Sequence, residues 1–223
     1  MSWVLLAFLV VGLQTHEAAL GDALALQRQA EALACSIQDD ACLGEEFRLR
    51  GAADQAVRRS DPAGLGCTAS DLACLAAAWL RIDKPNQSRL TAVMEARGWP
   101  PLAGEAAVGA WSVLQHLPSA DNETLALRER AAPLILAEVR AGRLRPDHYA
   151  RLADRNAMAR GASQPFGTLR PCRDGAFDQS SIDDVAAVDA RRRDIGMDIL
   201  LSESLRLYDH LCRQESASVR PKP

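Results

Sequence analysis

The sequence predicts an all-α protein: a single multi-helical domain preceded by a small disulfide-stapled helical segment. Its 223 residues are rich in alanine and leucine, and 48% are hydrophobic but only 4% aromatic, which is typical of packed helices. Apolar residues recur at three- and four-residue intervals over most of the chain. A duplicated cysteine motif near the N-terminus also predicts disulfide bonds that staple this helical segment.

The distribution of charged residues limits the kinds of macromolecule that the protein could bind. The 26 lysine and arginine residues are scattered among 29 acidic residues, and the formal net charge is -3. Proteins that bind phosphate backbones concentrate basic residues on one surface. We therefore expect no nucleic-acid partner.

The start of the chain resembles an export signal. An uncharged dipeptide precedes the apolar run Trp3–Val11, which is too short to span a bilayer. The best small-x-small cleavage site is Ala19-Leu20-Gly21, so we expect a signal peptide over residues 1–21 and no stable membrane anchor after its removal. Because lysine and arginine are missing before the apolar run, a buried first helix or an uncleaved anchor is the alternative.

Six cysteines, an even number, fit an oxidising compartment. Four of them form a repeat with the pattern Cys-x3-Asp-x-Ala-Cys-Leu, at Cys35 and Cys42 and again at Cys67 and Cys74. Aspartate or serine inside each repeat is a good helix N-cap, so a bond within each repeat would tie a loop to the following helix. The sequence does not fix the pairing. Zinc is the rival interpretation, disfavoured because CxxC spacing and a nearby histidine are missing.

Periodicity, capping residues and helix-stopping glycines and prolines predict nine helices. They cover residues 22–36, 41–58, 70–82, 85–97, 105–117, 122–142, 147–161, 183–194 and 198–212. Asp83 would cap the fourth helix, with Pro85 in its first turn. Residues 162–181 are rich in glycine, serine, aspartate and proline and are expected to form a loop, which the remaining cysteines, Cys172 and Cys212, would tie to the last helix.

These elements divide the mature chain into three parts. Residues 22–76 form the helical segment with the duplicated Cys-x6-Cys motif. Residues 77–214 form the main helical domain, and residues 215–223 a disordered tail.

Two helical positions stand out by the direction in which they point. His116 lies off the apolar face of its helix, so it is either a ligand-binding residue or a solvated histidine. Arg192 falls on an apolar face beside Val188, where an unpaired guanidinium would be very costly. Its acceptor would be Asp189, three residues earlier, or Asp154, or a bound anion.

Six short motifs follow one another between residues 77 and 211. In chain order they are Asp83 to Asn86, Gly98-Trp99-Pro100, Gln115-His116 with Asp121, Asp154-Arg155, Gln164 to Thr168, and Arg191-Arg192 with Gly196. In order and spacing they resemble a bacterial family classed as a domain of unknown function, which usually has tyrosine where Phe166 stands. Together with the signal, the resemblance implies a periplasmic or secreted protein of the bacterial envelope, and it supplies no reaction.

The favoured function is a ligand-binding or protein-interaction module with a polar cleft around Gln115-His116. Its partner would be an unidentified small molecule or envelope protein, and an arginine would hold a carboxylate or phosphate. No cofactor or metal is expected. The candidate ligand-binding residues are Gln115, His116, Asp121, Asp154, Arg155, Gln164, Gly167, Thr168 and Arg192.

Two other functions are compatible with the same residues, and the sequence does not decide whether the protein is an enzyme. A hydrolase would use His116 as general base, oriented by Asp121 or Asp154, although no nucleophile elbow, metal-ligand pair or paired-carboxylate signature accompanies it. In a purely structural domain, the polar motifs would form a buried hydrogen-bond network that holds the helices together. Asp154 could also simply pair with Arg151 on the surface.

Overall fold

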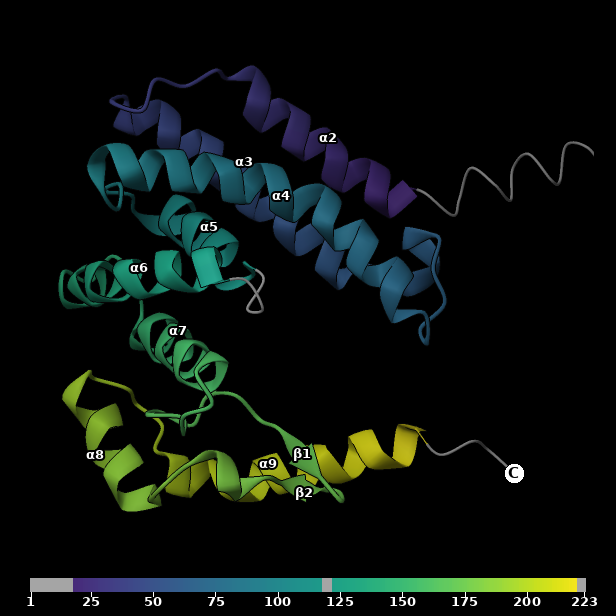
Figure 1. The fold of residues 1–223 in the computed structure, drawn as a ribbon, viewed down its shortest axis with the longest axis vertical. Coiled ribbons are helices and arrows are strands. Elements are labelled where there is room, and N and C mark those ends of the chain that lie inside the picture. The colour runs from purple at the N-terminus through teal and green to yellow at the C-terminus, as the bar shows by residue number, and fades with distance from the viewer. Residues whose placement is uncertain (1–17, 118–121, 220–223) are drawn as a thin grey trace, which may run out of the picture. The chain divides into compact units, whose positions relative to one another are not determined.

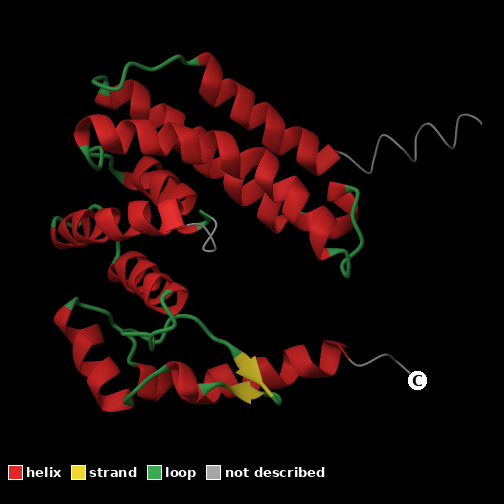
Figure 2. Cartoon of the chain, viewed as in Figure 1, coloured by secondary structure: helices red, strands yellow, loops and turns green. Residues whose placement is uncertain are grey.

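The computed structural model describes residues 18–117 and 122–219 (Figure 1). Helices dominate these ranges, as Figure 2 shows, and the all-α prediction is confirmed. The elements are α2 (Ala18–Ala32), α3 (Asp40–Arg59), η1 (Pro62–Leu65), α4 (Leu72–Arg97), α5 (Gly104–Gln115), α6 (Asn122–Arg140), α7 (Pro146–Ala159), β1 (Cys172–Arg173), β2 (Ala176–Phe177), η2 (Gln179–Ser181), α8 (Val185–Asp194) and α9 (Leu201–Val219). Of the predicted signal peptide, residues 1–17 lie outside the described ranges.

The chain divides into two compact units, residues 1–117 (unit 1) and 118–223 (unit 2). Helices α2 to α5 belong to unit 1, and α6 to α9 belong to unit 2. Helix α4 runs without a break across residues 76 and 77, where the sequence analysis divides the chain. Each unit is a helical assembly with its own packing.

Helix α4 also differs from the sequence prediction at Pro85, which lies inside the helix and not in its first turn. Interior proline removes one helical hydrogen bond and costs about 3 kcal/mol. Ile82, Asn86 and Leu90 are almost fully buried on the two sides of Pro85, so packing of this face offsets that cost. The expected helix break is therefore wrong, and Asp83 is not an N-cap.

Each of the two cysteine repeats closes its own disulfide, which resolves the pairing that the sequence left open. The bonds are Cys35–Cys42 and Cys67–Cys74. In both repeats, the aspartate three residues before the second cysteine accepts the backbone N–H of that cysteine at 3.0 Å and caps the helix. These disulfides staple the N-terminal helical region as predicted.

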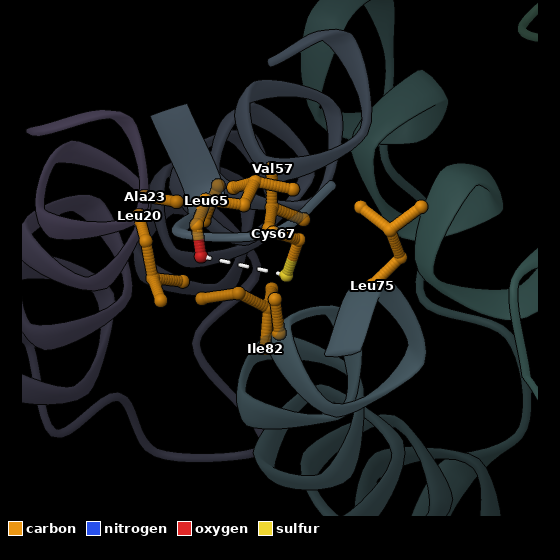
Figure 3. Packing of buried hydrophobic residues seen from close by; sticks show 9 residues of the cluster. Leu20, Ala23, Val57, Leu65, Cys67, Leu75 and Ile82 are labelled. Atoms are coloured by element: carbon orange, nitrogen blue, oxygen red, sulfur yellow. Dashed lines mark hydrogen bonds between the residues drawn. The ribbon is translucent and has the colours of Figure 1, made fainter. Parts of the chain in front are cut away.

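The core of unit 1 includes a cluster between α2, α3, η1 and α4 (Figure 3). Leu20, Val57, Leu65 and Ile82 pack there around Cys67, so the second staple is part of the core. Leu20 lies inside the segment that is predicted as a signal peptide, and its side chain is only 6% exposed. The described packing of unit 1 therefore begins within that segment.

Helices α3 and α5 cross at two glycines, Gly51 and Gly109. A Cβ atom on Gly51 would collide with the backbone of Gly109, and one on Gly109 would collide with the carbonyl oxygen of Phe47. The two backbones are therefore in direct contact, with no side chain between them. Both glycines stand inside helices, where alanine would be intrinsically favoured by about 1 kcal/mol.

Unit 2 begins with α6 and α7 and continues through the segment that was predicted as a loop. That segment contains the two-stranded antiparallel sheet β1–β2. A buried cluster of Phe177, Ile182, Val188, Leu201 and Cys212 joins this segment to α8 and α9. Helix α9 continues to residue 219, past residue 215, where the disordered tail was expected to begin.

Replacement of Gly109 by alanine tests the crossing of α3 and α5. Despite the better helix propensity of alanine, Gly109→Ala should lower the free energy of unfolding by about 1 to 3 kcal/mol, because its methyl group has no space. Chemical denaturation followed by circular dichroism measures the change.

The matched control is Gly44→Ala in α3. A Cβ atom there would meet Ala106 at 3.9 Å, an ordinary contact. This variant should be neutral or more stable by up to about 1 kcal/mol. Equal effects of the two substitutions would contradict a backbone contact at Gly109.

Candidate functional site

The side chain of His116, at the C-terminal end of α5, is hydrogen-bonded to Asp54 of α3. Its Nδ1 lies 2.8 Å and 3.0 Å from the two carboxylate oxygens. Asp54 is buried, whereas 17% of the His116 side chain is exposed. His116 is therefore a partly exposed imidazole attached to a buried carboxylate, and the alternative of a freely solvated histidine is wrong.

Arg58 connects Asp54 to Asp83 of α4. Its Nη1 donates to Asp54 at 2.6 Å, and its Nη2 donates to both oxygens of Asp83 at 2.8 Å and 2.9 Å. Its guanidinium also lies 6.0 Å from the ring centre of Trp79. The pKa of Asp83 is raised because burial disfavours its charge, an effect that the adjacent Arg58 opposes. Asp83, Arg58, Asp54 and His116 form one continuous polar chain, which we call the His116 network.

A second ion-pair cluster lies further towards the N-terminus of α3. Glu46 accepts from Arg50 at 2.8 Å and from Arg89 of α4 at 2.8 Å. Arg50 also donates to the side chain of Asn86 at 3.0 Å. Acidic and basic residues therefore alternate along α3 at four-residue intervals. The two ends of the Asp83 to Asn86 motif bind arginines of this series, Asp83 to Arg58 and Asn86 to Arg50.

Asp154 of α7 is not a surface residue paired with Arg151, which was the alternative that the sequence left open. It is fully buried, and one of its oxygens accepts the backbone N–H of Phe166 at 2.7 Å. The other accepts both the backbone N–H and the hydroxyl of Thr168 at 2.6 Å. Burial raises the pKa of Asp154, and these hydrogen bonds oppose that shift.

Arg192 holds the same loop from α8. Its Nε donates to the carbonyl of Phe166 at 2.7 Å, and its Nη2 donates to the carbonyl of Gly167 at 3.0 Å. Its Nη1 donates to the carbonyl of Ile199. The inward direction predicted for Arg192 is confirmed, since it is only 2% exposed, but its acceptors are backbone carbonyls and not Asp189.

The loop between Gln164 and Thr168 is fixed by its own residues as well. The Gln164 amide donates to the carbonyl of Leu169 at 3.0 Å and accepts its N–H at 2.8 Å. Gly167 has a φ of 59°, and a Cβ atom there would press on Leu201, so both conformation and space require glycine. Phe166 packs edge-on against Tyr149, with ring centres 5.6 Å apart, which needs no hydroxyl group.

The candidate residues therefore fall into two groups. Gln115, buried on α5, and His116 belong to unit 1. Those of unit 2 are Asp154, the half-buried Arg155, Gln164, Gly167, Thr168 and Arg192. Asp121 lies outside the described residues. The bonds within unit 2 give Asp154, Gln164 and Arg192 a structural role, and their part in ligand binding stays a prediction.

Two surface hollows of the described residues lie away from the candidate residues. One of about 500 Å³ is lined by Gly44 and Arg48 of α3 and by residues 101–103, 105 and 106, at the opposite end of α5 from His116. Another of about 360 Å³ lies at the start of α7, beside Gly196. Neither is lined by a candidate residue. Over residues 18–117 and 122–219, no three histidine, cysteine or acidic side chains are arranged to hold a metal ion.

Comparison with known proteins places the chain in a family. A model described as a family of unknown function (DUF6624) matches residues 42–213. The chain belongs to this family. No curated protein and no solved structure matches it. None of the DUF6624 chain's described helices has the length and apolar character needed to cross a membrane.

The DUF6624 match begins 35 residues earlier than the predicted resemblance, which started at residue 77. It therefore includes α3 from Cys42 onwards, with Asp54 and Arg58, which were not among the predicted site residues. The only sequence signal was the series Glu46, Arg50, Asp54 and Arg58, in which charge alternates every four residues. That pattern is also typical of a solvated helix face, so it did not identify a buried network.

Removal of Arg58 tests whether the His116 network is a buried charge system. Arg58→Met leaves the carboxylates of Asp54 and Asp83 without their shared cation, and should lower the free energy of unfolding by about 3 to 5 kcal/mol. The added substitution Asp83→Asn should recover part of the loss. Urea denaturation of the single and double variants measures both effects.

Arg48→Met is the control on the same helix. Arg48 pairs with Glu45 at 2.6 Å, but both side chains are more than 40% exposed, so this substitution should change stability by less than about 1 kcal/mol. If Arg58→Met were equally mild, the network would not be a buried charge system.

Proposed function

We propose that this protein binds a small polar ligand of the bacterial envelope through the imidazole of His116. The observation that carries the proposal is the hydrogen bond between His116 Nδ1 and the buried Asp54 carboxylate. A carboxylate at one ring nitrogen fixes both the orientation and the tautomer of a histidine, and leaves the other nitrogen for a ligand. The group offered to the ligand is therefore Nε2.

The remaining contacts of the network support this role for Nε2. No residue of the described ranges is hydrogen-bonded to it, and the side chain is partly exposed. Asp54 is held in turn by Arg58 at 2.6 Å and by Gln55 at 2.9 Å. Because every partner is itself bonded, the imidazole is positioned before a ligand arrives, as precise binding sites require.

The same geometry favours a second candidate, a hydrolase in which His116 is the general base. An imidazole with a carboxylate on Nδ1 can take a proton at Nε2 while the carboxylate stabilises the resulting cation. The orienting carboxylate would be Asp54, in place of Asp121 or Asp154. Binding is preferred because no activated nucleophile accompanies the pair among the described residues.

The disulfides and the N-terminal apolar run support the assignment to the bacterial envelope. Three disulfides join all six cysteines, and such bonds are typical of proteins in oxidising compartments. The apolar run at residues 3–11 is the sequence basis for export. Periplasmic or secreted location follows as part of the proposal.

Thermal unfolding of the oxidised protein tests the binding proposal. Cell-wall fragments, sugars, organic acids and phosphates are added in turn to the wild type and to His116→Ala. A ligand at a hundred times its dissociation constant adds about 2.7 kcal/mol to the stability of the wild type. We expect one compound class to raise its midpoint by several degrees and to leave His116→Ala unmoved.

His210→Ala is the matched control, since His210 is exposed on α9, and its midpoint should rise like that of the wild type. Stabilisation of all three proteins by the same compound would place the binding site elsewhere. A panel of ester, phosphate and peptidoglycan substrates separates the two candidates, because turnover that His116→Ala abolishes would favour the hydrolase over simple binding.

A further inference from the structure

The third disulfide, Cys172–Cys212, differs from the other two in what surrounds its sulfur atoms. Arg170 places its Nη1 3.0 Å from the sulfur of Cys172 and 3.3 Å from that of Cys212. The sulfur of Cys67 in the second staple lies 3.7 Å from the carbonyl oxygen of Leu65 (Figure 3), and that of Cys172 lies 3.8 Å from the carbonyl oxygen of Arg170, so the guanidinium is the feature that distinguishes the third bond. A guanidinium stabilises a thiolate, whereas a carbonyl oxygen does not.

The two sulfurs of this bond also differ in access. All six cysteines are described, and Cys172 is the exposed one among them. Cys212 is fully buried in the cluster with Phe177 and Leu201. An attacking thiolate therefore reaches the sulfur of Cys172, and Cys212 is the leaving group. Its developing negative charge lies beside the guanidinium of Arg170, which stabilises a thiolate at this position.

The bond is not the only attachment between the hairpin that carries Cys172 and α9. The rings of Phe177 and Tyr208 pack edge-on with centres 5.3 Å apart. The backbone N–H of Phe177 donates to Asp209 at 3.0 Å. These contacts do not depend on the sulfur bond, so they keep Cys172 close to Cys212 after the bond opens and allow it to close again.

We propose that Cys172–Cys212 is a thiol–disulfide exchange site, which a dithiol reductant opens while the two N-terminal staples stay closed. One thiolate of the reductant attacks the sulfur of Cys172, the bond to Cys212 breaks, and Cys212 leaves as a thiolate that takes up a proton. The second thiol of the reductant then attacks the mixed disulfide and releases Cys172 as a thiol. The protein gains two electrons and two protons, and the reductant becomes a disulfide.

This proposal goes beyond ligand binding at His116 and does not rest on it, since its residues belong to unit 2 and His116 belongs to unit 1. The segment that the bond ties to α9 continues from the loop between Gln164 and Thr168. Opening the bond therefore releases one covalent constraint on the Gln164–Thr168 loop without touching its hydrogen bonds to Asp154 and Arg192.

The test equilibrates the full folded chain with mixtures of reduced and oxidised dithiothreitol. Free thiols are then trapped with an alkylating agent and located by peptide mass spectrometry. Cys172 and Cys212 should be labelled together, at a reduced-to-oxidised ratio about tenfold or more below that needed for the other four cysteines. Simultaneous labelling of all six, or earlier labelling of an N-terminal staple, would overturn the proposal.

Arg170→Gln removes the positive charge from the sulfurs and should move the opening of this bond about tenfold towards more reducing mixtures. The control is Arg173→Gln, because Arg173 is exposed and pairs with Asp178 at 2.9 Å. It should titrate like the wild type. If Arg170→Gln also titrated like the wild type, the guanidinium would have no part in the exchange.

A double variant, Cys172→Ser with Cys212→Ser, shows whether opening is local. It should keep the helical circular dichroism signal of the wild type at room temperature and should leave the two staples as hard to reduce as before. Loss of the helical signal would mean that reduction unfolds unit 2, and would overturn a reversible exchange site.

Discussion

The contact between the backbones of Gly51 and Gly109 is the constraint on which the candidate site depends. Because neither residue has a side chain, α3 and α5 approach until their main chains touch. Asp54 follows Gly51 by one helical turn, and His116 follows Gly109 by about two. A larger separation at the crossing would move the imidazole away from the carboxylate, so the two glycines control a hydrogen bond in which neither takes part.

The candidate site depends, second, on the burial of charged side chains along α3. Glu46 and Asp54 are at most 2% exposed, and a buried carboxylate without a cation would be very costly. Glu46 therefore pairs with Arg50 and Arg89, and Asp54 pairs with Arg58, which also reaches Asp83 on α4. This arrangement fixes how α4 lies along α3, because a shift of one helical turn would separate the charges from their partners. The polar chain that orients His116 thus also sets the packing of unit 1.

Much of the fold could be predicted from the sequence, because apolar periodicity and capping residues act locally. Most of the helices and the inward direction of Arg192 follow from spacing, whereas the pairing of the repeat cysteines was left open by the sequence. The acceptors of Arg192 could not be predicted, because they are backbone carbonyls of a distant loop and carbonyls have no sequence signature. Pro85 was misread as a helix start, because the packing that retains it inside α4 is tertiary.

The site was predicted only in part for the same reason. His116 was a candidate because it lies off an apolar face, but Asp54 belongs to a helix whose alternating charges resemble a solvated surface. The glycine contact that joins them links residues 58 positions apart in sequence. The motifs of unit 2 looked like ligand-binding residues, since buried structural hydrogen bonds use the same polar side chains as binding sites do.

Nitrogen-15 NMR of the histidine-labelled protein tests the central claim most directly, because it reports which ring nitrogen of His116 carries the proton. For the neutral ring we predict that the proton is on Nδ1, donated to Asp54. In Asp54→Ala that preference should disappear. A proton on Nε2 in the wild type, or the same signals in both proteins, would contradict an imidazole oriented by Asp54.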